Sequence, residues 1–158
     1  MINIIKKYKL EIFFSISFLL MGMLVGYFSN SNGNYWYYNL NKPSFTPPSY
    51  IFPIVWTILY LMLGVIFAKI WQIKKYKGNQ LIAPIFILQL LINLTWSPLF
   101  FFAQRIDLAL YNIIILWSLL AYLLYMLRKE TFILILFIPY FMWISLALVL
   151  NYYIYILN

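Results

Sequence analysis

The stretch Lys42-Pro43-Ser44-Phe45-Thr46-Pro47-Pro48 decides the fold, because it separates two long apolar stretches of this 158-residue chain. Its three prolines lie within six residues. They fix φ, remove three backbone donors and push the preceding residues toward extended geometry. The segment therefore cannot be helical, and it is stiffer than an ordinary loop. The sequence predicts an ordered extramembrane loop over residues 29–49 that covers a helical bundle as a lid, with Pro43, Phe45, Pro47 and Pro48 in it.

The composition is that of a membrane protein. Of all residues, 66% are hydrophobic and 9% are charged, whereas roughly a quarter of the residues of a soluble domain are charged. Five apolar stretches are each long enough to cross a hydrocarbon core of ~30 Å as a helix, and they are uninterrupted, unlike barrel strands. The sequence predicts an all-α integral membrane protein, a single five-helix bundle over residues 1–158 with helices near 11–28, 50–72, 81–103, 107–127 and 132–157.

The first apolar stretch has a second interpretation. Lys6, Lys7 and Lys9 precede it, as a basic segment precedes the apolar run of a secretory signal peptide. A cleavage site also requires small residues in an A-x-A-like pattern. Residues 27–34 read Tyr-Phe-Ser-Asn-Ser-Asn-Gly-Asn and show no such pattern. We therefore expect a retained helix, and a mature chain identical to the encoded one.

The basic residues predict the orientation of the chain. The net charge is +8, and nine of the eleven basic residues fall on one side of the five predicted spans. Lys42 and Arg105 fall on the other side. The positive-inside rule puts the N-terminus in the cytoplasm, and the proline-rich loop and the C-terminus outside. Because the basic residues lie between spans and form no patch with interleaved aromatic residues, nucleic acid is not an expected partner. Abundant Asn, Ile, Lys, Phe and Tyr indicate an AT-rich genome and a bacterial plasma membrane.

Several kinds of chemistry are disfavoured by the residues that the chain lacks. It contains no His and no Cys, so the usual nitrogen and sulfur ligands of zinc, copper or iron are missing and no metal site is expected. The same lack of His removes the base of a serine hydrolase. The carboxylates are Glu11, Asp107 and Glu130, near different span ends, which leaves no pair for acid-base catalysis. No charged residue lies at mid-span, where ion-coupled carriers keep theirs.

Polar, aromatic and small residues recur at four-residue steps in three predicted helices, so each set shares one helix face. A small residue beneath a Trp leaves room for a flat group, and a nearby amide supplies hydrogen bonds. This combination is typical of an apolar pocket with few polar anchors, and it predicts a planar aromatic ligand. The sets are Gln89, Asn93 and Ser97, with Trp96 beside them; Trp56, Tyr60 and Gly64; and Trp143, Ala147 and Asn151.

Structural explanations compete with this pocket. Interfacial belts explain Trp36, Trp71 and the tyrosines at span ends better than a ligand does, whereas for Trp56, Trp96 and Trp143 the two explanations are about equal. For four polar residues, spacing alone favours hydrogen bonding between helices over ligand binding, with each bond worth well under ~2 kcal/mol. These residues are Gln89, Asn93, Ser97 and Asn151.

Small-residue motifs also have two explanations. Gly22 and Gly26 form a G-x-x-x-G pattern, and Gly64 and Ala68 repeat the small-x-x-x-small spacing. Both patterns permit close helix approach. Packing inside the bundle explains them as readily as a dimer does.

Motifs along most of the chain, in order, resemble one family. They are Trp36-Tyr37, Leu40-Asn41-Lys42-Pro43-Ser44-Phe45, Pro47-Pro48, Val55-Trp56 and Leu59-Tyr60; Gln89, Asn93, Trp96-Ser97-Pro98 and Phe100-Phe101; Ala109-Leu110 and Asn112; and Pro139-Tyr140, Trp143, Ala147 and Asn151. This series is similar to that of the TspO/MBR proteins, also called tryptophan-rich sensory proteins, translocator proteins or peripheral-type benzodiazepine receptors.

The resemblance implies a five-helix bundle, often a homodimer, whose pocket beneath the first loop takes up porphyrins and drug-like aromatic molecules. It implies no obligatory cofactor, and protoporphyrin IX or a related tetrapyrrole as ligand. The main hypothesis is thus a membrane receptor or sensor for tetrapyrroles. The alternatives are a light- and oxygen-dependent porphyrin-degrading enzyme that uses Trp56 and Trp143, and a tetrapyrrole or lipid transporter. The implied pocket residues are Tyr37, Trp56, Tyr60, Asn93, Trp96, Ser97, Trp143 and Ala147.

The chain departs from the family pattern at several positions. Phe45 and Tyr50 stand where many members carry Trp, and Asn112 stands where many carry Asp. The segment 149–158 has no Lys or Arg after its tyrosines, as the sterol-recognition pattern of animal members requires. This departure puts sterol binding in doubt. Metal-free protoporphyrin suits the chain better than heme, whose iron usually takes a His or Cys ligand.

Overall fold

The computed structural model describes residues 8–29, 33–72 and 81–158. Every regular element in these ranges is helical, and five helical segments are long and apolar enough to span a membrane. The predicted all-α membrane fold is thus confirmed. The elements are α2 (Lys9–Ser29), α3 (Gly33–Asn39), α4 (Ile51–Gln72), α5 (Ile82–Ser97), the π-helical turn η1 (Pro98–Phe102), α6 (Ile106–Met126) and α7 (Thr131–Leu157).

The predicted lid loop needs one correction. Residues 29–49 were expected to be loop throughout, but Gly33–Asn39 form the short helix α3. The prolines that exclude a helix begin only at Pro43, so they do not act on these residues. The stretch Lys42–Pro48 itself is non-helical, as predicted.

The third span changes its hydrogen-bonding pattern at Pro98. The α-helix ends at Ser97, and η1 carries the chain on, with the Ala103 N–H donating to the Pro98 carbonyl at 2.9 Å. A proline has no N–H and crowds the preceding turn. A wider i→i+5 turn is one way in which a helix accommodates such a residue.

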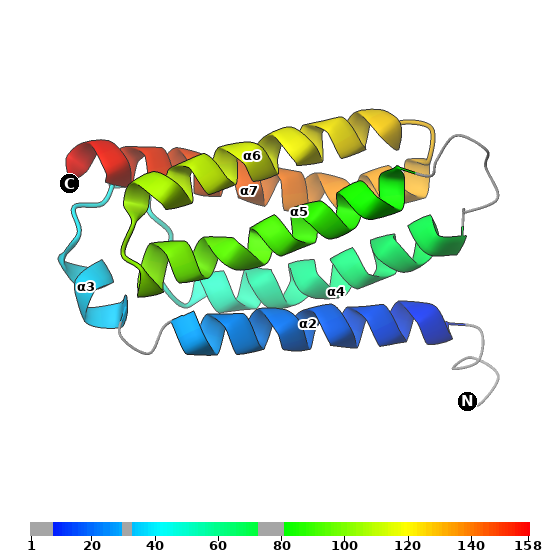
Figure 1. Ribbon diagram of the computed structural model, residues 1–158, viewed down its shortest axis with the longest axis horizontal. Coiled ribbons are helices and arrows are strands. Elements are labelled where there is room, and N and C mark those ends of the chain that lie inside the picture. The colour runs from blue at the N-terminus through cyan, green and yellow to red at the C-terminus, as the bar shows by residue number, and fades with distance from the viewer. Residues whose placement is uncertain (1–7, 30–32, 73–80) are drawn as a thin grey trace.

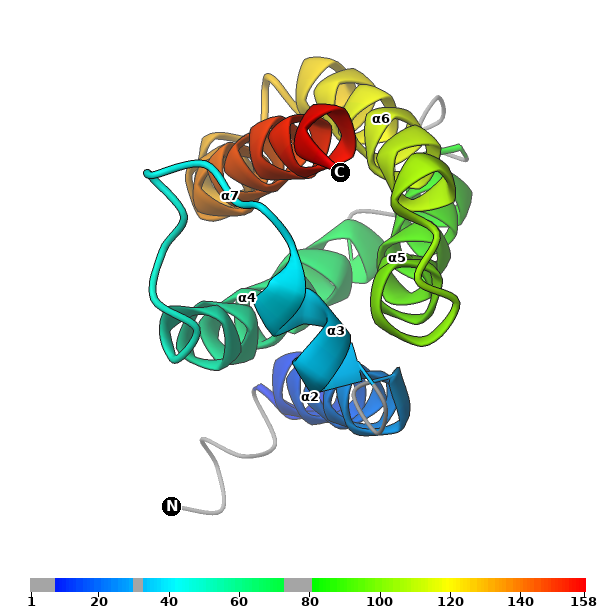
Figure 2. The same cartoon turned by 90° about the vertical axis from the view of Figure 1, so that its left-hand side faces the viewer.

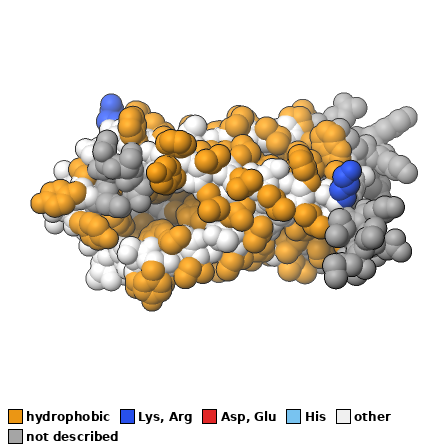
Figure 3. Space-filling view, turned by 90° about the horizontal axis from the view of Figure 1, so that it is seen from below, with side chains coloured by type: hydrophobic (Ala, Val, Ile, Leu, Met, Phe, Trp, Pro, Cys, Tyr) orange, Lys and Arg blue, Asp and Glu red, His pale blue; other side chains and the backbone are white. Residues whose placement is uncertain are grey.

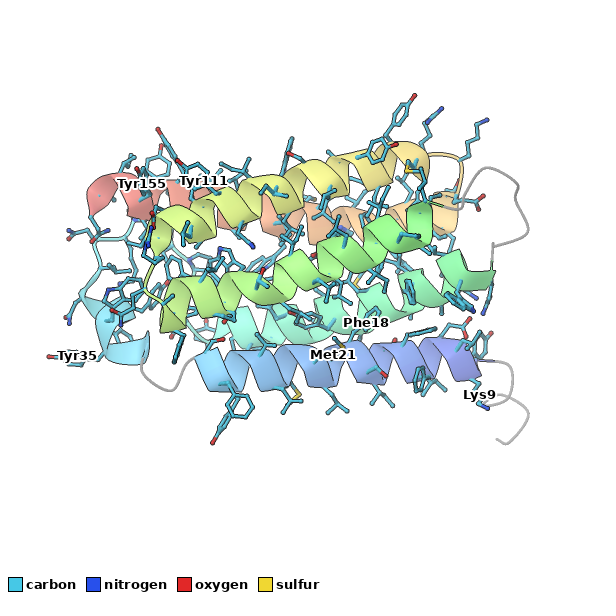
Figure 4. The ribbon with its side chains drawn as sticks, in the orientation of Figure 1. Lys9, Phe18, Met21, Tyr35, Tyr111 and Tyr155 are labelled. Carbon is cyan, nitrogen blue, oxygen red and sulfur yellow. The ribbon has the colours of Figure 1, made fainter. Side chains whose placement is uncertain are left out.

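The five spans form a ring. Going round it, α2 packs on α4, α4 on α7, α7 on α6, α6 on α5 and α5 on α2, as Figure 2 shows in end view. The start of α2 and the connection from α6 to α7 lie at one end of the bundle, and α3 and the end of α7 lie at the other (Figure 1). In Figure 4, Lys9 and Tyr35 mark these two ends, and Phe18 points into the bundle.

The outer surface matches a lipid environment. On the face drawn in Figure 3, hydrophobic side chains extend along the length of the molecule, and the basic side chains visible there lie near its ends. Lys9, Lys69 and the Arg128-Lys129 pair lie at the end where α2 begins, and Lys42 and Arg105 at the other. The other predicted cytoplasmic lysines, Lys6, Lys7, Lys74, Lys75 and Lys77, lie outside the described residues.

Glycines set the distance between α2 and α4. A Cβ added at Gly64 would clash with the backbone of Ser15, and the Ser15 hydroxyl donates to the Leu61 carbonyl at 2.8 Å. A Cβ added at Gly22 would clash with the Tyr60 ring, whereas one at Gly26 would meet no atom within 4 Å. Packing inside the bundle therefore explains Gly22 and Gly64 but not Gly26.

Candidate functional site

A small cavity lies inside the ring, between α4, α5, α6 and α7. Its volume is about 30 Å³. α2 contributes no side chain to it. Five of the eight predicted pocket residues line the cavity, namely Trp56, Asn93, Trp96, Trp143 and Ala147. The structure adds four lining residues that the sequence did not single out: Phe52, Ile113, Leu116 and Ile144.

Aromatic rings make the walls of this cavity. Trp56 lies on α4, Trp96 on α5 and Trp143 on α7. The Phe52 and Trp143 rings meet edge to face across α4 and α7, with centroids 5.6 Å apart. Trp96 is stacked on Phe100 at 5.0 Å and 17°. These contacts hold three indoles around one space, and aromatic faces of this kind favour flat apolar ligands.

Two hydrogen bonds fix the polar side chains around the cavity. The Tyr60 hydroxyl donates to Asn93 Oδ1 at 2.9 Å, which joins α4 to α5. The Trp96 indole N–H donates to Asn151 Oδ1 at 3.0 Å, and Asn151 Nδ2 donates to the Ile106 carbonyl at 3.2 Å. Asn151 thereby connects α5, α6 and α7.

The spacing of the polar residues favours interhelical hydrogen bonds for Gln89, Asn93, Ser97 and Asn151. The structure shows such bonds for three of these four residues. Asn93 and Asn151 make the bonds just described, and Gln89 Oε1 accepts a hydrogen bond from the Tyr140 hydroxyl at 3.0 Å. Gln89 and Tyr140 are both fully buried, so this pair ties α5 to α7 inside the core.

Trp143 supplies an unused donor. Its Nε1–H is buried and has no hydrogen-bond partner. A buried donor left unpaired costs about 1–3 kcal/mol. An acceptor atom on a bound molecule would remove that cost, so Trp143 offers both a stacking face and a polar anchor.

The remaining predicted pocket residues lie outside the lining. Tyr60 is one layer deeper, stacked on Trp56 with ring centroids 5.4 Å apart. Tyr37, on α3, packs against Phe100 and Phe101 at the end of the bundle. Ser97 follows Trp96 directly, and one residue turns a helix by about 100°. Its side chain therefore leaves the helix in a different direction from the indole that faces the cavity.

The lid loop contacts the end of α7 through Phe45 and Asn41. The Phe45 and Tyr153 rings meet edge to face with centroids 5.5 Å apart. Asn158 Oδ1 accepts from the Asn41 backbone N–H at 2.9 Å, and Asn158 Nδ2 donates to the Asn41 carbonyl at 3.0 Å. Pro43 accepts at its carbonyl from both the N–H and the hydroxyl of Thr46, at 3.0 and 2.7 Å, which closes a turn. Asn41, Phe45 and Thr46 are thus each held by a hydrogen bond or a ring contact.

Lys42 has a structural role in the loop. Its Nζ donates to the carbonyls of Tyr38 and Leu40 at 3.3 and 3.0 Å, and it lies 4.6 Å from the centroid of the Tyr37 ring. The ammonium group satisfies carbonyls at and just beyond the end of α3, where a positive charge is favourable. Burial lowers the pKa of Lys42 and raises the pKa of Tyr37.

The side chains of the lining are chemically compatible with a metal-free tetrapyrrole, but the cavity is too small for one. Within the described ranges, no group of three His, Cys, Asp or Glu side chains could hold a metal ion. Aromatic walls and the unpartnered indole N–H of Trp143 fit a flat ring with an acceptor. Ligand pockets usually measure about 300–1,000 Å³, far more than this cavity. A tetrapyrrole therefore enters only if the walls move apart.

Comparisons with known proteins agree with this architecture. The sequence model of the TspO/MBR family matches residues 13–157. A tryptophan-rich protein TspO from Chlorobaculum tepidum is 36% identical over 143 residues, covering 89% of this chain and 90% of its own. A tryptophan-rich sensory protein from Cereibacter sphaeroides is 32% identical over 74% of this chain and 73% of its own, and a translocator protein from Sus scrofa is 29% identical over 87% and 86%. This chain is therefore an integral membrane protein that belongs to the TspO/MBR family.

Proposed function

We propose that this protein is a membrane receptor or sensor that binds flat hydrophobic molecules, protoporphyrin-type tetrapyrroles above all, between α4, α5, α6 and α7. The observation that carries the proposal is the cavity itself, which Trp56, Trp96 and Trp143 wall from three different helices. Stacking on indole faces requires a planar ligand. The apolar lining requires one that partitions into a bilayer.

The unpartnered indole N–H of Trp143 suggests that the ligand carries a hydrogen-bond acceptor. Asn93 already accepts from Tyr60, and the Trp96 N–H already donates to Asn151. Among the lining residues, Trp143 has a buried polar atom without a partner, and we assign its N–H to an acceptor atom on the ligand. Ring nitrogens, carbonyls and carboxylates of tetrapyrroles all provide such an atom.

Metal-free rings are the preferred class. The nine lining residues are Phe, Trp, Asn, Ile, Leu and Ala, and none of them is the His, Cys, Met or Tyr that ligates heme iron. A heme bound here would keep solvent or nothing as its axial ligand. Protoporphyrin without metal loses no such bond on binding.

A titration in the dark tests the proposal. Detergent-purified protein is titrated with protoporphyrin IX, and the absorbance and fluorescence of the pigment are followed, so that removal of a Trp does not change the probe. We expect saturable binding at micromolar concentration. Trp143→Phe should weaken it about tenfold, which corresponds to one lost hydrogen bond of ~1.4 kcal/mol. Trp71→Phe, near the C-terminal end of α4 and away from the cavity lining, is the matched control. Unsaturable partitioning that is equal in all three proteins would refute the proposal.

The same samples distinguish a sensor from a degrading enzyme. After binding, blue light is applied under oxygen. A stable pigment spectrum is the result expected for a receptor. Loss of the pigment bands that requires the protein, and that disappears in Trp56→Phe or Trp143→Phe while binding persists, would move the protein into the enzyme class.

A further inference from the structure

The two ends of the bundle differ in how their positive charges are used. At the end that holds α3, Lys42 Nζ donates to the carbonyls of Tyr38 and Leu40. Arg105, at the same end, forms two hydrogen bonds to the Asp107 carboxylate, at 2.8 and 2.6 Å. Among the described residues of this end, both cations are therefore engaged within the protein.

Free positive charge lies at the opposite end. Lys69 is paired there with Glu11 at 2.7 Å. Lys9 and Lys129, by contrast, are exposed, and neither side chain forms an ion pair or a hydrogen bond with a described residue. Lys129 follows Arg128 in the turn between α6 and α7, so this turn carries two adjacent cations.

The turn holds Arg128 in a defined orientation. The guanidinium carbon lies 4.1 Å from the centroid of the Tyr125 ring, and Nη1 donates to the Tyr125 carbonyl at 2.8 Å. Within the described ranges this side chain donates no other hydrogen bond, so its remaining N–H groups are available to a ligand. A guanidinium is weakly hydrated, and its parallel N–H groups match two oxygens of a phosphate. Lys129 places a second positive charge beside it.

One carboxylate lies next to these two cations. Glu130 follows Lys129 directly, and it forms no ion pair with Lys129 or Arg128. The cations thus keep their charges free for another anion. Such an anion is attracted by Arg128 and Lys129 and repelled by Glu130, so changes to the two signs of charge should have opposite effects on its binding.

The outer face of α6 leads from this turn into the membrane. Its exposed side chains recur at three- and four-residue steps and so share one helix face; they are Tyr111, Ile115, Ser118, Tyr122 and Tyr125. In Figure 4, Tyr111 marks the far end of this face. Ten residues of a helix, the separation of Ile115 from Tyr125, measure about 15 Å, which is half of a hydrocarbon core of ~30 Å. Tyrosines near the turn are typical of the headgroup level. The face therefore fits an acyl chain whose headgroup lies at the turn.

We propose that the Arg128-Lys129 turn and the outer face of α6 bind one anionic membrane lipid, with the headgroup phosphate on the two cations and an acyl chain along the helix face. Phosphatidylglycerol has this chemistry, because its headgroup carries a phosphodiester and no positive charge. Phosphatidylcholine shares the phosphate but adds a quaternary ammonium, which the two cations repel. No residue of this site lines the cavity, so the site is independent of the proposed function.

Native mass spectrometry of the detergent-solubilised full chain tests the proposal. The protein is titrated with phosphatidylglycerol or with phosphatidylcholine of identical acyl chains, and no porphyrin is present. We expect the first phosphatidylglycerol to bind at least tenfold more tightly than the first phosphatidylcholine. Equal affinities for the two lipids would overturn the proposal.

Three substitutions locate the site. Lys129→Gln should weaken phosphatidylglycerol binding about fivefold, as expected for the loss of one cation near the membrane surface, and leave phosphatidylcholine binding unchanged. Glu130→Gln should strengthen phosphatidylglycerol binding by a similar factor. Lys9→Gln, which removes a free cation of the same end from α2, is the matched control and should change the affinity less than twofold. Equal effects of Lys129→Gln and Lys9→Gln would show a general attraction to the basic end and would overturn the assigned site.

The Tyr125 ring gives a test that leaves every charge in place. Tyr125→Phe keeps the ring beneath Arg128, whereas Tyr125→Ala removes it. We expect Tyr125→Ala to weaken phosphatidylglycerol binding two- to fivefold, as the loss of an exposed cation–π contact predicts, and Tyr125→Phe to leave it unchanged. Unchanged binding in both variants would contradict the part given to this ring.

A soluble phosphate is the competing occupant. Glycerol 3-phosphate carries the same anionic group without an acyl chain, so at millimolar concentration it should not displace bound phosphatidylglycerol. Displacement would overturn the lipid as occupant and would assign the turn to a soluble phosphate.

Discussion

The indole N–H of Trp96 donates a hydrogen bond to Asn151 Oδ1 at 3.0 Å, and this bond joins the third span to the fifth beside the cavity. Asn151 is almost completely buried, and its Nδ2 donates on to the Ile106 carbonyl. One side chain thus holds the wall formed by α5, α6 and α7. Trp96, which lines the cavity, is thus positioned by a residue outside the lining.

Replacement of Asn151 should therefore be costly. Asn151→Ala leaves the Trp96 N–H without its acceptor and the Ile106 carbonyl without its donor. We expect a loss of about 2–3 kcal/mol of unfolding free energy, measured by denaturant titration in detergent. Trp96→Phe removes the same hydrogen bond but should lower the unfolding free energy less through that loss than Asn151→Ala does, because Asn151 keeps its contact with Ile106. In a double-mutant cycle the two changes should couple; strictly additive effects would contradict the role given to the bond.

The two glycines Gly64 and Gly26 should respond in opposite ways to the same substitution. Gly64→Ala places a methyl group against the backbone of Ser15, so α2 and α4 have to separate. We expect a loss of ~2 kcal/mol or more, as for other overpacked contacts. Gly26→Ala meets no neighbouring atom within 4 Å and should change stability by less than ~0.5 kcal/mol. Thermal unfolding of both variants in one detergent makes the comparison, and similar losses would refute the assigned packing.

Replacement of Gln104 by glycine should increase the stability of the protein. Its φ is 54°, and the Arg105 N–H beyond it donates to the Leu99 carbonyl at 3.0 Å, as at a left-handed helix end. A side chain is disfavoured by about 1 kcal/mol or more in this conformation. Gln104→Gly should therefore stabilise the protein by ~1 kcal/mol in thermal unfolding, and Gln104→Val should destabilise it. A stabilising Val variant would contradict this backbone geometry.

The charge distribution predicts which end of the bundle faces the cytoplasm. Tyr35 is exposed on α3, and Lys129 is exposed in the turn between α6 and α7 at the opposite end. In intact cells, a membrane-impermeant thiol reagent should label Tyr35→Cys directly and Lys129→Cys only after permeabilisation. The chain has no Cys of its own to interfere. The reverse pattern would invert the predicted orientation.

Much of the fold follows from the sequence, because run length and proline position act locally. The five spans appear where the apolar stretches predict them, and Lys42–Pro48 is non-helical because its prolines leave little choice. α3 escaped prediction because seven residues give too short a pattern to separate a helix from a loop. The contact between Asn41 and Asn158 escaped prediction for another reason: it joins residues 117 positions apart, and nothing local marks such a contact.

The candidate site was predictable only where a residue differs from its membrane surroundings. Trp143 and Asn93 differ from the Leu and Ile around them, and both line the cavity. Phe52, Ile113 and Leu116 also line it, but an apolar side chain suits a lipid-facing surface as well as a cavity wall. For Phe52 the spacing gives weak evidence, because it lies one helical turn before Trp56 and so on the same face of α4. The bilayer removes the contrast that marks core residues in soluble proteins.

The most direct test of the central claim fills the cavity. Ala147 lines it, whereas Ala103 is exposed in the turn after η1. The measurement is dark titration of the wild type, Ala147→Phe and Ala103→Phe with protoporphyrin IX, on protein whose helical circular dichroism is unchanged. The account predicts saturable binding by the wild type and Ala103→Phe, and at least tenfold weaker binding by Ala147→Phe. Equal affinity in all three proteins would show that the ligand binds elsewhere and would contradict the account.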